Sequence, residues 1–248
     1  MDDHIFSIAV CRRLFIPLKC IPSSLSCVCK RGQGKSCDLH GVHLSTACGS
    51  GGQRNKTHDN INYVFERICR ANGYRVKREE SGIFRDTDPD SNKRPDLTVY
   101  GVPGFQRSKL ILDSTVVGIH SSGILRNVSP GKAIDIAIKR KNTTYGLISS
   151  TNNLDFLPLV FESGGNMSDD VVKVLKALLK GGDSYVRKNL DHCLAFWLTR
   201  LSVCLQNSLS MSIYTRARSY TAKSDRLMLE TAQDKELKEL VIRLNNSG

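Results

Sequence analysis

Residues 94–116 carry two β-strand patterns separated by a turn, and no other stretch constrains the fold as strongly. Residues 98–100 and 110–117 are rich in β-branched, aromatic and aliphatic side chains, which favour strands. Two glycines and a proline lie between them and favour a turn. We therefore predict two paired strands of one hairpin.

Each strand of this hairpin has an acid where an acid is unfavourable. Asp96 opens the first strand, and Asp113 interrupts the apolar run of the second. A buried carboxylate is costly unless it is paired or binds a metal. On paired strands the two carboxylates can converge on one Mg²⁺, a cation that takes oxygen ligands. The alternative is that Asp96 caps a turn and Asp113 pairs with a lysine.

The second concentration of reactive side chains lies between residues 27 and 48, which hold four of the nine cysteines and two histidines. Zinc takes four thiolate and imidazole ligands in a tetrahedron. The predicted ligands are Cys27, Cys29, His43 and Cys48, with Cys37 and His40 as substitutes. The alternative is a flexible arm with loose cysteines. The odd count and uneven spacing fit a reduced compartment better than a disulfide framework.

The residues around these cysteines give no sign of a hydrophobic core. Residues 21–37 are rich in Ser, Gly, Lys and Cys and have no apolar periodicity. A segment of this composition stays disordered unless a metal organises it. We therefore expect bound zinc, rather than apolar packing, to order residues 21–48.

The net charge of +12 indicates a polyanionic partner, most simply nucleic acid. Apolar residues between 61 and 69 follow a helical period, so we predict a helix that begins at Asp59 or Asn60 and ends at Gly73. Arg54, Lys56 and His58 would then precede the positive end of a helix, where phosphates bind. The alternative is a solvated basic loop.

The remaining patterns complete a small α/β core. Residues 74–78 alternate as a strand, residues 133–145 predict a helix, and residues 146–148 a further short strand. The apolar run 157–161 is the best candidate for a central buried strand. Three helices are expected after it, over residues 171–179, about 190–205 and about 224–244.

Nothing in the chain indicates a membrane partner, because no apolar run reaches the roughly 18 residues of a membrane span. The start Met1-Asp2-Asp3 is also unlike a secretory signal. We therefore expect an intracellular protein.

Taken in order, these elements resemble the restriction-enzyme-like endonuclease domain, of the PD-(D/E)xK type, at the C-terminus of reverse transcriptases of site-specific non-LTR retrotransposons. The resemblance covers roughly residues 10–215. It is carried by Cys27-x-Cys29, Gly41-Val42-His43-x4-Cys48, Lys56-Thr57-His58-Asp59-Asn60, Arg94-Pro95-Asp96, Leu112-Asp113-Ser114-Thr115-Val116 and Lys141-x3-Tyr145.

Three features depart from the family pattern. The knuckle begins C-x-C rather than C-x-x-C, and the family's Arg-His-Asn element reads Thr57-His58-Asp59. Thr115 stands where most restriction enzymes have a lysine. In the retrotransposon type the lysine is expected from the following helix, which makes Lys141 our choice, with Lys132 and Lys139 as rivals.

The resemblance implies a mixed central sheet flanked by helices, with an N-terminal zinc knuckle and C-terminal helices. It also implies hydrolysis of phosphodiester bonds in DNA, with Mg²⁺ or Mn²⁺ as the catalytic cofactor and Zn²⁺ in the knuckle. Asp96, Asp113 and Lys141 would be catalytic, and Asp96 and Asp113 would hold Mg²⁺ with a backbone carbonyl, most simply that of Ser114. Glu79 would add a further carboxylate.

The resemblance also bears on partners and organisation. The residues expected to contact DNA, or else RNA, are Arg54, Lys56, His58 and Arg94. A nuclear location beside a reverse transcriptase domain or protein is implied, and an inactive zinc-knuckle nucleic-acid-binding module is the alternative. The expected divisions are a helical segment (1–20), a zinc knuckle with a basic loop (21–58), an endonuclease-like core (59–182) and a helical extension (183–248).

Overall fold

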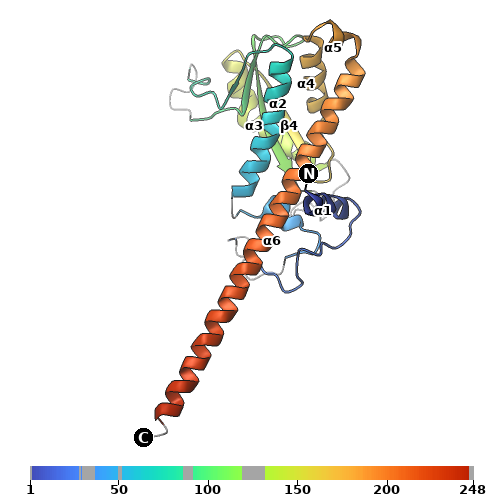
Figure 1. The fold of residues 1–248 in the computed structure, drawn as a ribbon. Helices are drawn as coiled ribbons and strands as arrows, with labels where there is room; N and C mark the ends of the chain where they lie inside the picture. Colours follow the sequence, from blue (N-terminus) through green and yellow to red (C-terminus); the bar gives the residue numbers. More distant parts are fainter. Residues whose placement is uncertain are drawn as a thin grey trace.

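The computed structural model describes residues 2–27, 29, 37–49, 52–85, 92–118 and 132–245, with backbone alone for residues 224 and 226–245. A mixed four-stranded sheet flanked by helices forms its centre (Figure 1). The strands are β1 (Val76–Arg78), β2 (Leu97–Tyr100), β3 (Lys109–Val117) and β4 (Asp155–Glu162), in that spatial order. The first three are antiparallel, and β4 runs parallel to β3.

The predicted hairpin is confirmed as β2 and β3, but the expected place of the apolar strand is wrong. Within the described part of the chain, β4 lies at the edge of the sheet. Leu159, Val160 and Phe161 are nevertheless fully buried. Helices cover them instead of a second neighbouring strand, and an edge position also tolerates Pro158, which has no N–H to donate.

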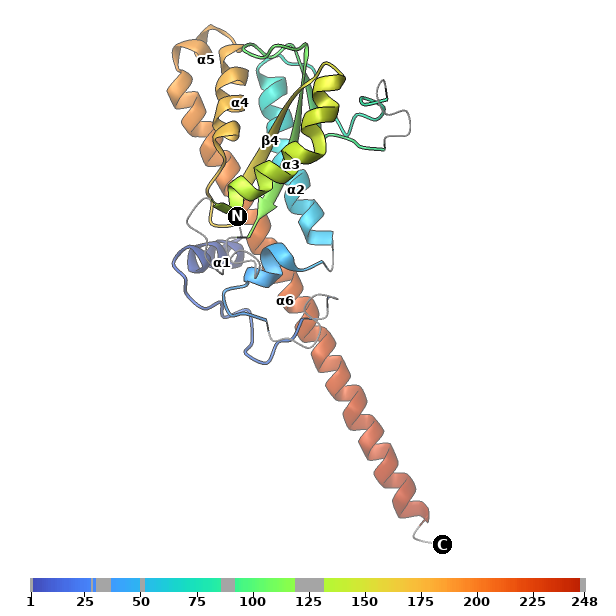
Figure 2. The same ribbon diagram turned by 180° about the vertical axis from the view of Figure 1, so that it is seen from behind.

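Helices cover both faces of the sheet (Figures 1 and 2). On one face α2 (Gln53–Ala71), α4 (Asp169–Lys180) and α6 (Leu190–Asn245) enclose the main core with strand residues such as Leu112 and Phe161. On the other face α3 (Lys132–Thr151) packs Tyr145 and Ile148 against Ile111 and Phe84. The short α5 (Ser184–Lys188) joins α4 to α6.

Two predicted boundaries of helices are wrong because periodicity marks only the buried part of a helix. The helix α2 begins at Gln53, after Gly52, rather than at Asp59 or Asn60. Its first two turns are polar, and Thr57 is their buried residue. Residues 146–148, expected as a strand, lie inside α3, because one half-buried glycine does not stop a helix whose next residues still pack.

The two helices expected after residue 190 are one helix, α6, of 56 residues. Its sequence contains neither proline nor glycine, so nothing interrupts the backbone hydrogen bonds. Figure 1 shows α6 running along the sheet, then past the N-terminal segment, and projecting beyond both. The helix expected over residues 171–179 is α4, which begins two residues earlier, after Ser168 at its N-cap position.

The N-terminal segment forms a second, smaller core against α6. Helix α1 (Asp3–Arg13) and the short π-helix η1 (His43–Ala47) both pack on α6. Contrary to expectation, residues 21–48 do have apolar packing, since Ile21, Leu25 and Leu44 are buried in this core with Ile213. The predicted division of the chain at residues 58 and 59 falls inside α2, and the domain boundaries stay predictions.

Candidate functional site

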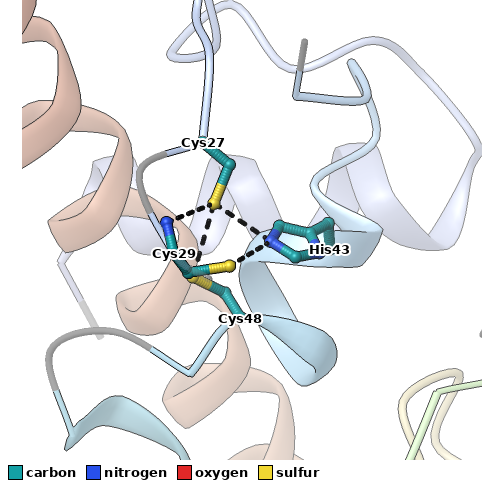
Figure 3. Close-up of side chains that lie close together, drawn as sticks. All are labelled: Cys27, Cys29, His43 and Cys48. Atoms are coloured by element: carbon teal, nitrogen blue, oxygen red, sulfur yellow. Dashed lines mark hydrogen bonds between the residues drawn. The ribbon is translucent and has the colours of Figure 1, made fainter. Parts of the chain in front are cut away.

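Four side chains of the N-terminal core converge to form a candidate metal centre (Figure 3). One ligand atom from each of Cys27, Cys29, His43 and Cys48 lies within 4.8 Å of the others. The Sγ atoms of Cys27 and Cys48 are 3.8 Å apart. Two thiolates 2.3 Å from a tetrahedral zinc would be separated by roughly 3.8 Å, so the donors and their spacing fit Zn²⁺.

The imidazole completes the set. His43 Nε2 lies 3.1 Å from Cys27 Sγ and 3.3 Å from Cys29 Sγ (Figure 3). The C-x-C turn is compact enough for the Cys29 N–H to donate to Cys27 Sγ at 3.4 Å. These are the four ligands chosen from the sequence. The substitutes Cys37 and His40 stay outside the group: Cys37 is buried nearby, and His40 lines a separate recess.

Burial shapes the chemistry of this cluster. Desolvation raises the pKa of the Cys27 thiol to about 12 and lowers the pKa of His43. The neutral imidazole is the form that binds a metal, whereas a metal must displace the Cys27 proton. The Asp38 carboxylate accepts hydrogen bonds from the N–H groups of Val42 and His43, at 2.7 and 2.9 Å, and so holds the start of η1 in place.

Three residues of α6 that the sequence did not single out support the cluster. Ser212, Arg216 and Tyr220 follow one another at intervals of four and share one helix face. Tyr220 Oη lies 2.9 Å from Cys48 Sγ. Arg216 donates to the backbone carbonyl oxygens of Leu44 and Cys48, and Ser212 also donates to that of Leu44. The sequence did contain a signal for these three residues, because Arg216 is a charged residue on the apolar stripe of α6.

The second candidate site is acidic and lies where β2, β3 and α3 meet. The register pairs Leu97 with Leu112, so the next residues, Asp96 and Asp113, stand opposite each other. Asp113 is 3 % exposed. Lys141, which projects from α3, forms an ion pair through Nζ with Asp113 Oδ2. The structure therefore brings together the two acids and the lysine chosen from the sequence.

Helix α2 reaches the same site through His58. Its Nε2 lies 2.8 Å from Asp96 Oδ2, which also accepts the backbone N–H of Ser114 at 2.6 Å. The Ser114 hydroxyl donates to Asn62 Oδ1 at 2.7 Å. Asn62 was missed in the sequence, although it lies one helical turn after His58 and so shares its face. His58 thus contacts a carboxylate that sequence reasoning assigned to Mg²⁺.

Burial and neighbouring groups shift the pKa values of three side chains at this site. Burial raises the pKa of Asp113, the Asp96 carboxylate raises it further, and Lys141 opposes both effects. The hydrogen bond to Asp96 raises the pKa of His58, against desolvation. Burial and the Asp113 and Asp96 carboxylates raise the pKa of Tyr145. Perturbed groups that gather in this way are typical of functional sites.

Other residues predicted for this site are placed differently. Glu79 is exposed, and among the described residues it does not join a group of three or more close metal-ligand atoms; its backbone N–H donates to the Asp96 carbonyl oxygen at 3.1 Å. Lys132 and Lys139 are exposed on α3. Arg54 and Lys56 are exposed in the first turn of α2, and Arg94 is exposed before β2.

A cleft of about 370 Å³ lies between α2, β3, η1 and α6, and His58 of the acidic site lines it. Its walls include Arg54 and His58 from α2, Thr115 from β3, Ser45 from η1 and Arg216 from α6. The cleft is therefore lined by cationic side chains immediately beside the acids. Such a lining suits an anionic group of a substrate that also reaches Asp96 and Asp113.

Comparison of the chain with models of known protein families, and with curated proteins, found no match. No helix in the described ranges has the length and hydropathy required to cross a membrane.

Proposed function

We propose that this protein is a Mg²⁺-dependent DNA endonuclease of the PD-(D/E)xK type, similar to those that accompany reverse transcriptases of non-LTR retrotransposons. One observation carries the proposal: the Lys141–Asp113 ion pair, with Asp96 opposite Asp113 on the paired strand. Asp113 belongs to β3, Asp96 directly precedes β2, and Lys141 belongs to α3. The order of helix, strand, hairpin, helix and strand through α2–β4 also supports it.

The acidic pair suits a hard divalent cation, because two opposed carboxylates raise the charge density that such an ion neutralises. When bound by Asp96 and Asp113, Mg²⁺ or Mn²⁺ supplies a Lewis acid that lowers the pKa of water and offsets phosphate charge. Lys141 holds an ammonium group beside Asp113, where it can stabilise charge that develops on the phosphate.

The other residues of the site position groups or bind substrate. His58 and the Ser114 N–H together fix one oxygen of Asp96, which orients the carboxylate. Arg54, in the neighbouring cleft, would contact a flanking phosphate, as would Lys56 and Arg94 on the surface. Such phosphate contacts set the register of the DNA and carry no sequence information. The zinc cluster would brace η1 against α6 beside this cleft.

The test is a plasmid-nicking assay with Mg²⁺ on the full chain, with DNA binding measured in parallel. Asp113→Asn should retain DNA binding and lose Mg²⁺-dependent nicking. Asp191→Asn, which replaces an exposed aspartate at the start of α6, serves as the matched control and should nick normally. Nicking by Asp113→Asn at close to the wild-type rate would rule out this active site.

A second candidate function is nucleic-acid binding without catalysis. It is favoured by the cationic partners that both acids already have within the protein, His58 for Asp96 and Lys141 for Asp113. In that case the wild-type protein would bind DNA with the salt dependence expected for the nuclease but would show no Mg²⁺-dependent nicking. On the resemblance, we propose a nuclear location and a reverse transcriptase as partner for either function.

A further inference from the structure

A second recess, of about 240 Å³, lies beside η1 and is lined by other residues than the acidic site. It is formed where the end of α1, the loop before η1 and the turn after β4 meet, and Ser45 of η1 lines both this recess and the cleft beside His58. The lining side chains that matter are Arg12, Arg13, Phe15 and His40. None of the proposed catalytic residues is among them.

Two adjacent arginines give the recess its charge. Arg12 donates to Gln206 Oε1 and to the Ser163 carbonyl oxygen, both at 3.3 Å. Arg13 donates to Ser202 Oγ at 3.4 Å. Among the described residues neither guanidinium forms an ion pair with a carboxylate. Desolvation, together with the charge of Arg13, lowers the pKa of Arg12 to about 10.

The groups around Arg12 and Arg13 leave the charge of the two guanidinium groups available to a ligand. Asp38 is the acid whose charge acts on Arg12, but its carboxylate already accepts the N–H groups of Val42 and His43. A Cβ atom at Gly165 would come within 2.6 Å of Arg13 Nη2, so the glycine leaves room for the guanidinium over the turn after β4. Like charges held close together in a recess favour an anion between them.

His40 adds an unused polar atom to the same wall. Its Nδ1 is buried and has no hydrogen-bond partner in the part of the chain that the structure describes. A buried polar atom without a partner is costly unless a bound group satisfies it. His40 therefore offers a third polar contact to a ligand of the recess.

Phe15 stands at the rim in an unusual backbone conformation. The Ile16 N–H donates to the Cys11 carbonyl oxygen, and the Phe15 N–H to that of Arg12, which together form a Schellman motif at the end of α1. Phe15 occupies the left-handed position, with φ of 53°, where glycine is usual. Its ring contacts the His40 ring, with the centroids 6.3 Å apart, and is still 64 % exposed, so much of the aromatic surface stays open to a ligand.

We propose that this recess binds one nucleotide of a single-stranded nucleic acid, with the phosphate on Arg12, Arg13 and His40 and the base stacked on Phe15. Only an unpaired base can offer its face to an aromatic side chain, and the recess is too small to admit a duplex. Leu14 and Ile16 are exposed as well but do not line it. The site shares no residue with the acidic site and does not depend on catalysis there.

The experiment measures binding of the full chain to a fluorescein-labelled oligothymidine, in buffer without Mg²⁺ and without chelator, by fluorescence anisotropy. Phe15→Leu should weaken binding by about fivefold or more, the lower end of one base–aromatic stack. Arg13→Gln should also weaken it. Arg187→Gln, which replaces an exposed arginine of α5, should not.

Two further arms separate stacking from damage to the fold. On a strand of abasic units, wild type and Phe15→Leu should bind equally weakly, because no base is present to stack. Phe15→Gly relieves the left-handed strain, so its melting temperature should hold or rise while its affinity for oligothymidine falls. Oligothymidine binding by Phe15→Leu that equals wild type would overturn the proposal. The proposal would also be overturned if Phe15→Leu lost as much affinity for the abasic strand, or for duplex DNA, as for oligothymidine. An equal loss on duplex DNA would indicate a surface that binds polyanions in general.

Discussion

The guanidinium of Arg216 donates to the backbone carbonyl oxygen of Cys48 at 2.9 Å, although 168 residues separate them in the chain. Arg216 is 3 % exposed, and it also donates to the Leu44 carbonyl oxygen. These contacts join the middle of α6 to both ends of the loop that supplies His43 and Cys48. The geometry of the metal centre therefore depends on a helix that contributes none of its ligands.

Arg216→Gln should lower the free energy of unfolding by about 3 kcal/mol, because it removes a charged donor from the buried Cys48 carbonyl oxygen and leaves the Leu44 carbonyl oxygen with Ser212 alone. Urea denaturation measures this loss. Arg218→Gln, an exposed arginine two residues later on α6, is the control and should change stability little. Equal stability of the two variants would show that the buried contacts contribute no net stabilisation.

Purified protein should contain about one zinc per chain, which elemental analysis would detect. Cys48→Ser should lose the metal, whereas Cys193→Ser, outside the cluster, should keep it. Since burial raises the pKa of Cys27, a metal must displace a tightly held proton, and zinc affinity should fall as the pH is lowered. Protein prepared without chelator that contained no zinc would contradict this assignment.

Lys141 and Asp113 should show opposite effects on stability in the absence of Mg²⁺. Lys141→Ala leaves a buried carboxylate without its cation and should cost about 3 kcal/mol. Asp113→Asn should hold or slightly raise the melting temperature, because the raised pKa of Asp113 means that its charge is unfavourable in the folded state. Lys139→Ala, which replaces an exposed lysine of α3, is the control.

The same lysine variants should separate in a single-turnover nicking assay at saturating DNA. Lys141→Ala should slow cleavage by about 10²- to 10³-fold, as for the loss of one electrostatic stabiliser. Lys139→Ala and Lys132→Ala should matter much less, since neither lies at the acids. If Lys141→Ala cleaves normally and Asp113→Asn does not cleave, the acidic site is still the proposed metal site, and only the catalytic role of Lys141 is wrong.

His58 should titrate above its ordinary pKa, because the hydrogen bond to Asp96 favours its charged form. NMR of the imidazole protons measures this, and Asp96→Asn should move the pKa back down. A raised folded pKa means that the pair stabilises the protein fully below about pH 6.5, the unfolded value, and that this contribution is lost as the pH rises through the folded pKa. The stability difference from His58→Gln should therefore shrink at alkaline pH.

DNA affinity should fall steeply with salt because the chain carries a net charge of +12. Lys56→Ala should weaken binding to all sequences alike and reduce the salt slope by roughly one unit, since Lys56 is exposed in the first turn of α2. Binding assays on several duplexes at different salt concentrations measure both effects. A loss confined to certain sequences would mean that Lys56 contacts bases.

Local sequence patterns predicted the central hairpin and many of the candidate site residues. The β2–β3 hairpin follows from strand formers on either side of a glycine turn, and its register places Asp96 opposite Asp113. The four cluster residues could be chosen because zinc accepts few side-chain types. Lys141 could also be preferred over Lys139, because it lies four residues before Tyr145 and seven after Ile134, on the face of α3 that packs on the sheet.

Tertiary structure alone decided how these parts are covered and supported. An apolar strand such as β4 has the same sequence pattern whether a strand or a helix buries its free side, so its edge position could not be read from residues 155–162. The contacts of Arg216 and Tyr220 with Cys48, and of His58 with Asp96, join elements far apart in the chain. Propensity and periodicity describe neighbours along the sequence, whereas these contacts depend on how whole helices pack.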